Sequence, residues 1–577
     1  MRKAVSLLVA CMCVVIFYIS GYSQHGGLGS ANKILFNAKI FTADVQHPYA
    51  EAVAIKGNKV FAVGNLDDVK KLMDATTVLI DMHGQTILPG FVDSHNHAVE
   101  GGEGLMRANV DDSVLTVDAL AAYADEVQQN GFGMIGNFLV IDGINIETWS
   151  KIDELHSTFS GGKYANQPVL LRGSDGHTAW ANKALMNIAG INKAFIKSLP
   201  ASTKKYFNVS GDDEPDGFFA DSGFYKVDAV LPAVPVDDNM AAAKGLAYNN
   251  ALGITAWLDP AAGHIHDRIN AILNGYQYLL QHNKLTAHIA AVVVADADEQ
   301  PQPQVNQLKA LQKMYNGNHN LAVLGFKIFA DGVIEYPTQT AALSKPYTNS
   351  GSYGALMYKP QNFARFAITA DKQKLLVHVH AIGDRAVTET LNGFEAARKA
   401  NGYSGIPHTI THVQVMNAGD IPRFKQLHVL ASLQLLWALG DPTTVDIVKP
   451  YIDTELYRYQ YPARSLLQAG ATICGASDWN VSTANPFEAI YEAETRKGRL
   501  GVLDSTQCMP RMAMLYAYTI NSAKALMMEK TIGSIEAGKY ADLVLVDRDV
   551  LTVSPLEMEK TQVLWTMFEG KIVYERK

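Results

Sequence analysis

Histidine, lysine and aspartate recur in this sequence at spacings that suit a metal site. His95 and His97 stand two residues apart in GFVDSHNH, directly after an apolar run. In an extended strand, side chains two residues apart point to the same side, so both imidazoles can reach one ion. A single pair of this kind is weak evidence, because surface hydrogen bonds also satisfy histidines.

Other residues of metal-ligand type lie near the C-terminal ends of other apolar runs. They are Lys327 in GFKIFADG, His378 and His380 in VHVHAIGD, His412 in THVQ and Asp478 in GASDW. Barrels of parallel strands build their active sites at this end of the strands. Because unrelated core histidines would not gather at one end of a barrel, a metal site explains the pattern better.

Eight short apolar runs alternate with helix-like segments, which indicates βα units and a parallel sheet. We expect strands at residues 88–96, 253–259, 288–296, 324–331, 375–381, 408–415, 429–436 and 471–478. This α/β pattern predicts a (β/α)₈ TIM-like barrel over 89–531, with a doubly wound open sheet as the alternative. The stretch at about 105–245 is longer than a crossover helix needs and predicts an insertion after the first barrel strand.

Both chain ends have a sequence pattern typical of antiparallel β-structure. Residues 31–88 contain short alternating runs separated by Gly, Asn and Asp, and residues 532–577 repeat this style in GSIEAGKYADLVLVDRD and VLWTMFEGKIVYERK. Short strands separated by such turn residues are typical of β-hairpins. We therefore expect the two ends to form one composite β-sandwich beside the barrel.

The composition is that of a soluble globular protein. The 577 residues are 48% hydrophobic and 18% charged, with a formal net charge of −8. An acidic chain without a basic patch is not expected to bind nucleic acid.

Residues 1–23 read as a signal peptide cut before Gln24, with a basic start, an apolar stretch and small residues at the exit. Cleavage would leave no stable membrane span and a secreted or periplasmic protein. The alternative is a chain anchored in the membrane by an uncleaved N-terminal segment. The mature chain would then keep only Cys474 and Cys508, too few for a disulfide scaffold.

Several sequence motifs taken together resemble those of the metal-dependent amidohydrolase superfamily. The resemblance is specifically to amidohydrolase family 3, the branch that includes N-substituted formamide deformylase. The motifs are LPGFVDSHNH, DGHTAWANKAL, GITAWLD, GFKIFADG, HVHAIGDRAV, THVQ, GASDWNVSTANPF and GSIEAGKYADLVLVD, which span the chain from about residue 33 to its end. The resemblance implies the same barrel and composite sandwich. It matches the family's metal ligands to His95, His97, Lys327, His380, His412 and Asp478.

The resemblance also implies the chemistry of the site. The ligands suit one or two divalent ions, with zinc first. Lys327 would add carbon dioxide and bridge two metals as a carbamate, or else pair as an ammonium with Asp331 or Asp478. Asp478 would act as general base and acid, and His412 would polarise the substrate carbonyl if it faces the substrate. His378 receives a structural role beside the ligands.

Substrate contacts are expected from the insertion and from the seventh strand. In DGHTAWANKAL we assign Asp175, His177 and Trp180 to substrate binding, with His177 orienting the carbonyl; the alternative is that Asp175 caps a helix beginning near His177. Gln434 matches the Gln of a Gln-Pro motif in the family, but in this sequence Leu-Leu-Trp follows it. The bulky residues predict an apolar pocket wall and leave the substrate of any known member in question.

The predicted function is hydrolysis of carbon–nitrogen bonds in small amides that are not peptides: N-acyl, N-formyl or cyclic amides. Two alternatives remain open. The same site could hydrolyse esters, lactones or phosphoesters, or the chain could be a periplasmic metal-binding protein without catalysis. A homo-oligomer is compatible with the sequence.

Overall fold

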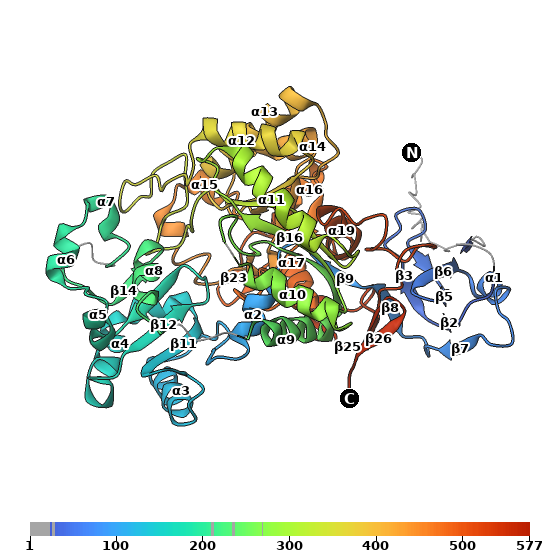
Figure 1. Ribbon diagram of the computed structural model, residues 1–577, viewed down its shortest axis with the longest axis horizontal. Helices are drawn as coiled ribbons and strands as arrows, with labels where there is room; N and C mark the ends of the chain where they lie inside the picture. The colour runs from blue at the N-terminus through green and yellow to red at the C-terminus, as the bar shows by residue number, and fades with distance from the viewer. Residues whose placement is uncertain (1–22, 26–28, 209–212, 233–236, 268) are drawn as a thin grey trace, which may run out of the picture.

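The centre of the molecule is a barrel of eight parallel strands whose order in space follows their order in the chain (Figure 1). The computed structural model describes residues 23–25, 29–208, 213–232, 237–267 and 269–577. The barrel strands are β9 (Phe91–Asp93), β15 (Ile254–Asp259), β16 (His288–Val294), β17 (Leu321–Phe329), β18 (Leu376–Ala381), β19 (Thr409–His412), β20 (Leu430–Leu433) and β21 (Ile473–Gly475). Ser94 N donates to Gly475 O over 2.9 Å and joins the last strand to the first. The predicted (β/α)₈ barrel is confirmed, and the open sheet is excluded.

The barrel strands are buried on both faces, as parallel sheets generally are. Side chains from strands around the barrel, among them Val92, Ala256, Val292, Leu376 and Cys474, pack into one interior cluster. The barrel helices are α2 (Ala98–Gly104), α9 (Asp238–Ala251), α10 (Ala271–Gln281), α11 (Pro301–Tyr315), α12 (Pro360–Lys372), α13 (Asp384–Asn401), α14 (Ile421–Leu427), α15 (Thr454–Tyr457), α16 (Ala463–Gln468), α17 (Pro486–Thr495), α18 (Arg511–Tyr516) and α19 (Ser522–Ala525).

Strands from both chain ends form two sheets beside the barrel. The first contains β1 (Ser23–His25), β6 (Lys59–Gly64), β5 (Ala52–Lys56), β2 (Lys33–Phe36) and β7 (Val78–Asp81). The second contains β26 (Lys571–Glu575), β25 (Val563–Phe568), β24 (Leu543–Val546), β8 (Thr86–Pro89), β3 (Lys39–Phe41) and β4 (Tyr49–Ala50). Val544 lies opposite Leu88 in the β24–β8 pair. One core, including Leu35, Ile55, Leu543 and Met567, joins the two sheets.

The stretch predicted as the first barrel strand, 88–96, divides between two sheets. Leu88 and Pro89 end β8 in the composite sheet, and the barrel strand β9 begins only at Phe91. The remaining elements of the composite region are α1 (Leu66–Lys70) and α20 (Pro555–Glu559).

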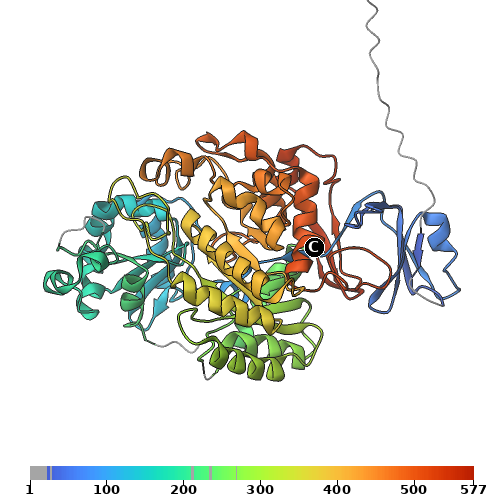
Figure 2. The same cartoon turned by 90° about the horizontal axis from the view of Figure 1, so that it is seen from above.

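The insertion after β9 has a sheet and a core of its own. Its strands are β10 (Met134–Ile135), β11 (Phe138–Ile144), β12 (Val169–Gly173), β13 (Thr178–Ala181) and β14 (Phe218–Ala220). Its helices are α3 (Val117–Gln129), α4 (Ile152–Phe159), α5 (Lys183–Ile188), α6 (Lys193–Ser198), α7 (Ala201–Lys204) and α8 (Ser222–Asp228). The insertion and the composite sheets lie on opposite sides of the barrel in both views (Figures 1 and 2).

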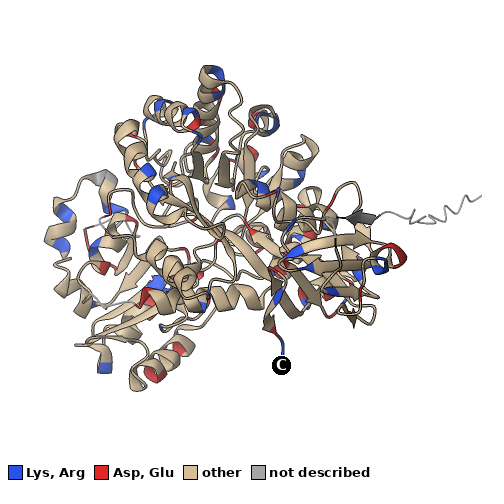
Figure 3. Cartoon of the chain, turned by 45° about the vertical axis from the view of Figure 1, so that its right-hand side comes forward, with Lys and Arg blue, Asp and Glu red and all other residues tan. Residues whose placement is uncertain are grey.

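Charged residues of both signs are interspersed over the outer helices and loops (Figure 3). Within the described residues, no helix is both long and apolar enough to cross a membrane. Cys474 and Cys508 are free thiols. The predicted signal peptide lies outside the described residues, except for Ser23.

Candidate metal centre

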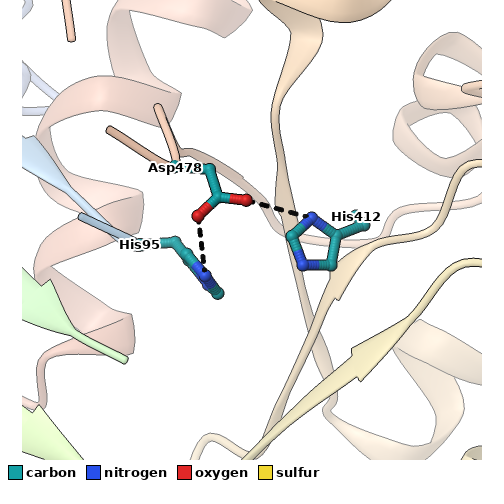
Figure 4. A group of neighbouring side chains, drawn as sticks. All are labelled: His95, His412 and Asp478. Carbon is teal, nitrogen blue, oxygen red and sulfur yellow. Dashed lines mark ion pairs between the residues drawn. The ribbon is translucent and has the colours of Figure 1, made fainter. Parts of the chain in front are cut away.

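Asp478 lies between two histidines at the C-terminal mouth of the barrel (Figure 4). Its Oδ1 is 3.3 Å from His95 Nε2, and its Oδ2 is 3.8 Å from His412 Nδ1. One ligand atom from each of these buried residues lies within 4.8 Å of the others. His95 follows β9, His412 ends β19 and Asp478 follows β21, so three separate strands bring the group together.

Three further histidines surround this group. His97 Nε2 is also 3.3 Å from Asp478 Oδ1. The His380 ring centroid lies 4.5 Å from that of His412, and the His378 centroid lies 4.9 Å from that of His95. The histidines predicted from separate strands are thus brought together at one end of the barrel.

Hydrogen bonds from behind the site orient the ligand rings. His95 Nδ1 is 2.7 Å from His378 Nε2, and His378 Nδ1 is 2.6 Å from Thr409 Oγ1. This relay occupies one nitrogen of His95 and directs the other toward Asp478. His412 Nδ1, the nitrogen that lies 3.8 Å from Asp478 Oδ2, is also 3.0 Å from Gln434 Oε1, which leaves Nε2 of this ring free of that bond. Outer hydrogen bonds of this kind fix the tautomer and the orientation of metal-binding imidazoles.

Asp93 ties the ends of β9 and β21 together. Its carboxylate accepts hydrogen bonds from the backbone N–H groups of His95 and Ser477, from Ser477 Oγ and from Asn96 Nδ2. Burial raises the pKa of Asp93 to about 6, although these hydrogen bonds oppose the shift. A fully buried carboxylate with four donors therefore sets the spacing between the two loops that carry His95 and Asp478.

The backbone is strained at two of these residues. His412 and Asp478 have φ values of 72° and 56°, in the left-handed region that non-glycine residues rarely occupy. Such conformations cost about 1–3 kcal/mol each and persist only where the surrounding structure enforces them. In this protein they turn the imidazole and the carboxylate toward each other.

Lys327 is buried without a salt-bridge partner. It is 1% exposed, and its Nζ lies 4.9 Å from the centre of the Phe329 ring. The expected ammonium pair with Asp331 is absent, because that carboxylate accepts the backbone N–H groups of Ala342, Ile382 and Gly383. No ion pair of Lys327 occurs among the described residues. Burial lowers the pKa of Lys327 to about 7, so much of the amine is neutral near neutral pH.

The charge states of the ligands suit metal binding. Burial lowers the pKa of His95 to about 3, and it also lowers the pKa values of His380 and His412, so these imidazoles are neutral. Burial opposes ionisation of Asp478, but the neighbouring histidines hold its pKa well below the usual value. For His97, Glu100 and Asp478 outweigh burial and raise the pKa to about 10, so a metal must displace its proton.

The group fits a divalent cation on the evidence of its own atoms. Asp478 Oδ1 is buried and makes no hydrogen bond in the described structure, although His95 Nε2 and His97 Nε2 each lie 3.3 Å from it. A buried carboxylate oxygen without a hydrogen bond is costly, and a cation is the partner that imidazole and carboxylate donors select. A metal bound here would be held by His95, His412 and Asp478, with His97, His380 and Lys327 around it.

A cavity of about 570 Å³ opens over this group. All six predicted metal ligands line it, together with Asp175 and His177 from the insertion. His177 Nδ1 is 2.9 Å from Asp221 Oδ1, which raises the pKa of His177 although burial opposes the shift. Leu436 and Trp437 line the cavity as the predicted apolar wall.

Two predicted substrate contacts lie elsewhere. Trp180 is fully buried in the insertion core, where its Nε1 donates to Asp216 O, so it does not reach the cavity. Gln434 is fully buried and positions His412 without lining the cavity.

The alternative role for Asp175 also fails, because no helix begins near His177. The Asp175 carboxylate instead accepts the backbone N–H groups of His177 and Thr178 in the turn between β12 and β13.

Some site residues could not be identified from the sequence. Asp93, Ser477 and Thr409 act through other side chains. The only indication of their role in the sequence is that they stand close to motifs that contain predicted metal ligands. Glu335 and Gln414 line the cavity from the loops after β17 and β19. Gln414 had a weak signal, since it stands two residues after His412.

A buried His–His–Asp group at the C-terminal mouth of a (β/α)₈ barrel defines a metal-dependent hydrolase of the barrel class. The model of the "Amidohydrolase family" matches residues 78–574. The chain belongs to this family, which confirms the predicted metal-dependent hydrolase of carbon–nitrogen bonds.

Characterised and solved relatives span the chain nearly end to end. "Protein LONG AFTER FAR-RED 3" of Arabidopsis thaliana is 27% identical and covers 94% of this chain and 92% of its own. N-substituted formamide deformylase of Arthrobacter pascens is 24% identical, covering 94% of this chain and 98% of its own. An uncharacterized metal-dependent hydrolase of Pyrococcus horikoshii OT3 shares the fold, with a TM-score of 0.67, 23% identity, and coverage of 91% of this chain and 99% of its own.

Proposed function

We propose that the chain hydrolyses small N-acyl, N-formyl or cyclic amides, with Asp478 moving the proton. The observation that carries this proposal is the position of Asp478, whose buried Oδ1 lies in the cavity 3.3 Å from both His95 Nε2 and His97 Nε2. The similarity to N-substituted formamide deformylase supports an N-formyl or N-acyl substrate.

When bound, a divalent metal, with zinc as the first choice, supplies a water whose pKa is lowered to about 7 and an electrophile for the carbonyl. Asp478 then accepts the proton of the attacking water and returns it to the departing nitrogen. His177, which pairs with Asp221, lines the cavity with its ring centroid 6.2 Å from that of His380, and it would donate to the substrate carbonyl oxygen. Trp437, whose ring stacks parallel to His412, excludes water from one wall.

We also propose that Lys327 is carboxylated. Its neutral amine adds carbon dioxide and releases a proton to solvent, which gives an anionic carbamate that would suit a divalent metal. Intact-protein and peptide mass spectrometry at controlled bicarbonate tests this step. We expect the wild-type peptide to carry the adduct and Lys327→Ala protein to lose both the adduct and part of the bound metal. Unchanged metal content in Lys327→Ala protein would reject a bridging role.

The test of function is a screen of N-formyl and N-acyl compounds against matched esters with metal-reconstituted protein. Asp478→Asn should lower kcat by about 10²- to 10⁴-fold while the protein stays folded. Asp441→Asn is the matched control, because Asp441 lines the cavity but pairs with Arg499. Activity confined to esters would instead assign the site to ester or lactone hydrolysis. A folded, metal-loaded protein that hydrolyses nothing would support the non-catalytic alternative.

We propose a secreted or periplasmic location on the basis of residues 1–23. Cell fractionation followed by N-terminal sequencing tests it, and a mature N-terminus at Gln24 is expected. Recovery of the unprocessed chain from membranes would support the anchored alternative.

A further inference from the structure

The cavity beside the metal centre contains more carboxyl groups than the predicted metal ligands account for. Of its carboxylates, Glu100 lies 2.9 Å from His97 Nδ1 and Asp441 pairs with Arg499 over 2.8 Å. Glu335 has no such partner: no Lys, Arg or His forms an ion pair with it in the part of the chain that the structure describes. Lys327 is the single lysine of the lining.

Glu335 is held in place from two sides. Gln414 Nε2 donates to its Oε1 over 2.7 Å, and Ile334 N donates to its Oε2 over 3.1 Å. Gln414 stands two residues beyond His412, so this carboxylate is connected directly to the loop that carries a predicted metal ligand. Each oxygen keeps further lone pairs for a ligand in the cavity.

The surroundings of Glu335 favour an organic cation over a second metal. Burial raises its pKa, and a bound cation would offset that loss of hydration. Tyr461 and Trp437 line the same cavity, and aromatic faces attract ammonium and guanidinium groups. Among the described residues, the group with metal-ligand spacing comprises His95, His412 and Asp478 and does not include Glu335.

A second carboxylate in the lining independently lacks a partner. Glu492, on α17, has a buried Oε2 that makes no hydrogen bond in the described structure. It faces the same cavity from the wall formed after β21. The lining thus offers acceptor oxygens from Glu335 and Glu492, whereas it has no arginine to receive an anionic substrate group.

We propose that the substrate is an amide with a cationic group, an ammonium or a guanidinium, away from the bond that is cleaved, and that Glu335 binds this group. The inference rests on the proposed amide hydrolysis and adds the charge of the substrate. Phe329, Leu436 and Trp437 would contact the apolar part between the two polar ends.

The test compares a mono-N-formylated hexanediamine with N-formylheptylamine, in which a methyl group replaces the ammonium. We expect the wild type to have a kcat/KM about tenfold to hundredfold higher for the cationic compound, in line with a hydrogen bond to a charged group. Glu335→Gln, which keeps an acceptor oxygen for Gln414, should lose this preference by slowing only the cationic compound. Glu154→Gln makes the same charge change on the exposed surface of α4 and should keep the preference.

Equal rates of the wild type on both compounds would overturn the inference and leave amide hydrolysis standing. An equal loss on both compounds in Glu335→Gln would also overturn it. If the wild type hydrolyses neither compound, the proposed function fails for this class, and calorimetry with the zinc-loaded protein decides the inference. Tighter binding of the cationic compound to the wild type, but not to Glu335→Gln, supports it; equal binding contradicts it.

Discussion

At the scale of single residues, the ligands depend on side chains that never face the cavity. His378 is fully buried behind His95 and links it to Thr409. His378 and His380 stand in one sequence motif. Strand periodicity alone could not separate their roles, because side chains two residues apart point to the same face of a strand. The structure separates them: His380 lines the cavity, and His378 lies beneath it.

Replacing His378 should therefore weaken the metal site without removing a ligand. We expect His378→Asn to raise the Kd for zinc by about 10- to 100-fold, because His95 loses the partner that fixes its ring. Competition with a chromophoric chelator measures this affinity. His408→Asn is the control, since His408 is an equally buried barrel histidine that pairs with Asp371. Wild-type zinc affinity in a folded His378→Asn protein would refute the positioning role.

Residue types that bind metal could be predicted from the sequence more readily than residues that contact substrate. His95, His97 and Asp478 follow strands whose direction the barrel fixes, and Lys327 lies near the C-terminal end of such a strand. Trp180 and Gln434, predicted to contact the substrate, do not line the cavity, because the face on which they lie depends on packing within the insertion and behind β19. No local pattern encodes that packing.

At the scale of elements, two glycines let helices approach the metal loop closely. A Cβ on Gly245 of α9 would lie 1.9 Å from Ala98 O, and one on Gly102 of α2 would lie 1.9 Å from Ala241 O. Helix α2 begins directly after His97, so the α2–α9 contact fixes the loop that carries the first histidine pair.

Gly245→Ala should consequently disturb both stability and metal binding. We expect a loss of about 1–3 kcal/mol in the free energy of unfolding, as for overpacked cores, and a weaker affinity for zinc. Chemical denaturation and chelator competition measure the two effects. Gly419→Ala is the control, because a Cβ there meets nothing within 4 Å. If the two variants behave alike, the close contact does not position the loop.

Asp371, at the C-terminal end of α12, joins two neighbouring barrel segments. Its buried carboxylate accepts hydrogen bonds from Arg398 on α13 and from His408, which precedes β19. Burial alone would raise its pKa, but the bonds from His408, Ser404 and Asn401 hold the pKa well below the usual value. A depressed pKa contributes stability above the unfolded pKa, and this contribution is lost as the pH falls through the folded value.

Asp371→Asn should thus lower the free energy of unfolding by about 3–5 kcal/mol at neutral pH, the usual cost of breaking a buried ion pair. The difference from the wild type should shrink below a pH of about 4, where the unfolded carboxylate takes up a proton. Urea unfolding at several pH values measures it, with the exposed Asp153→Asn as the reference variant. A difference that does not change with pH would contradict this account.

Predicted and observed strands agree in number and order but differ in their ends. The run at 429–436 was expected to be one strand, whereas β20 ends at Leu433 and a 3₁₀ turn follows over Leu435–Trp437. Apolar residues continue past the strand because they form the wall of the cavity. Hydrophobicity marks burial, and the end of a strand depends on where its neighbours stop pairing.

At the scale of the whole molecule, the C-terminal strands stabilise the start of the barrel. Strand β24 pairs along the whole of β8, and only Gly90 separates β8 from the first barrel strand. Gly90 N also donates to Asp542 O. The composite sheets therefore support the barrel directly.

Deleting residues 532–577 should accordingly reduce soluble yield sharply and abolish a cooperative thermal transition. The physical reason is that β8 would be left as an unpaired apolar edge, which favours aggregation. Circular dichroism melting and size-exclusion chromatography measure the outcome. Removing only Arg576 and Lys577 serves as the control. A truncated monomer that melts cooperatively and binds zinc like the full chain would show that the barrel does not need the composite sheets.

The pairing of β8 with β24 also constrains the order in which the protein can mature. During synthesis Leu88 leaves the ribosome long before Val544 has been made. Strand β8, which directly precedes the first barrel strand, therefore lacks its partner β24 until nearly the whole chain has been synthesised. The barrel itself closes only when Ser94 meets Gly475. Because Asp478 follows the last barrel strand, His95, His412 and Asp478 can come together only after β21 has been made.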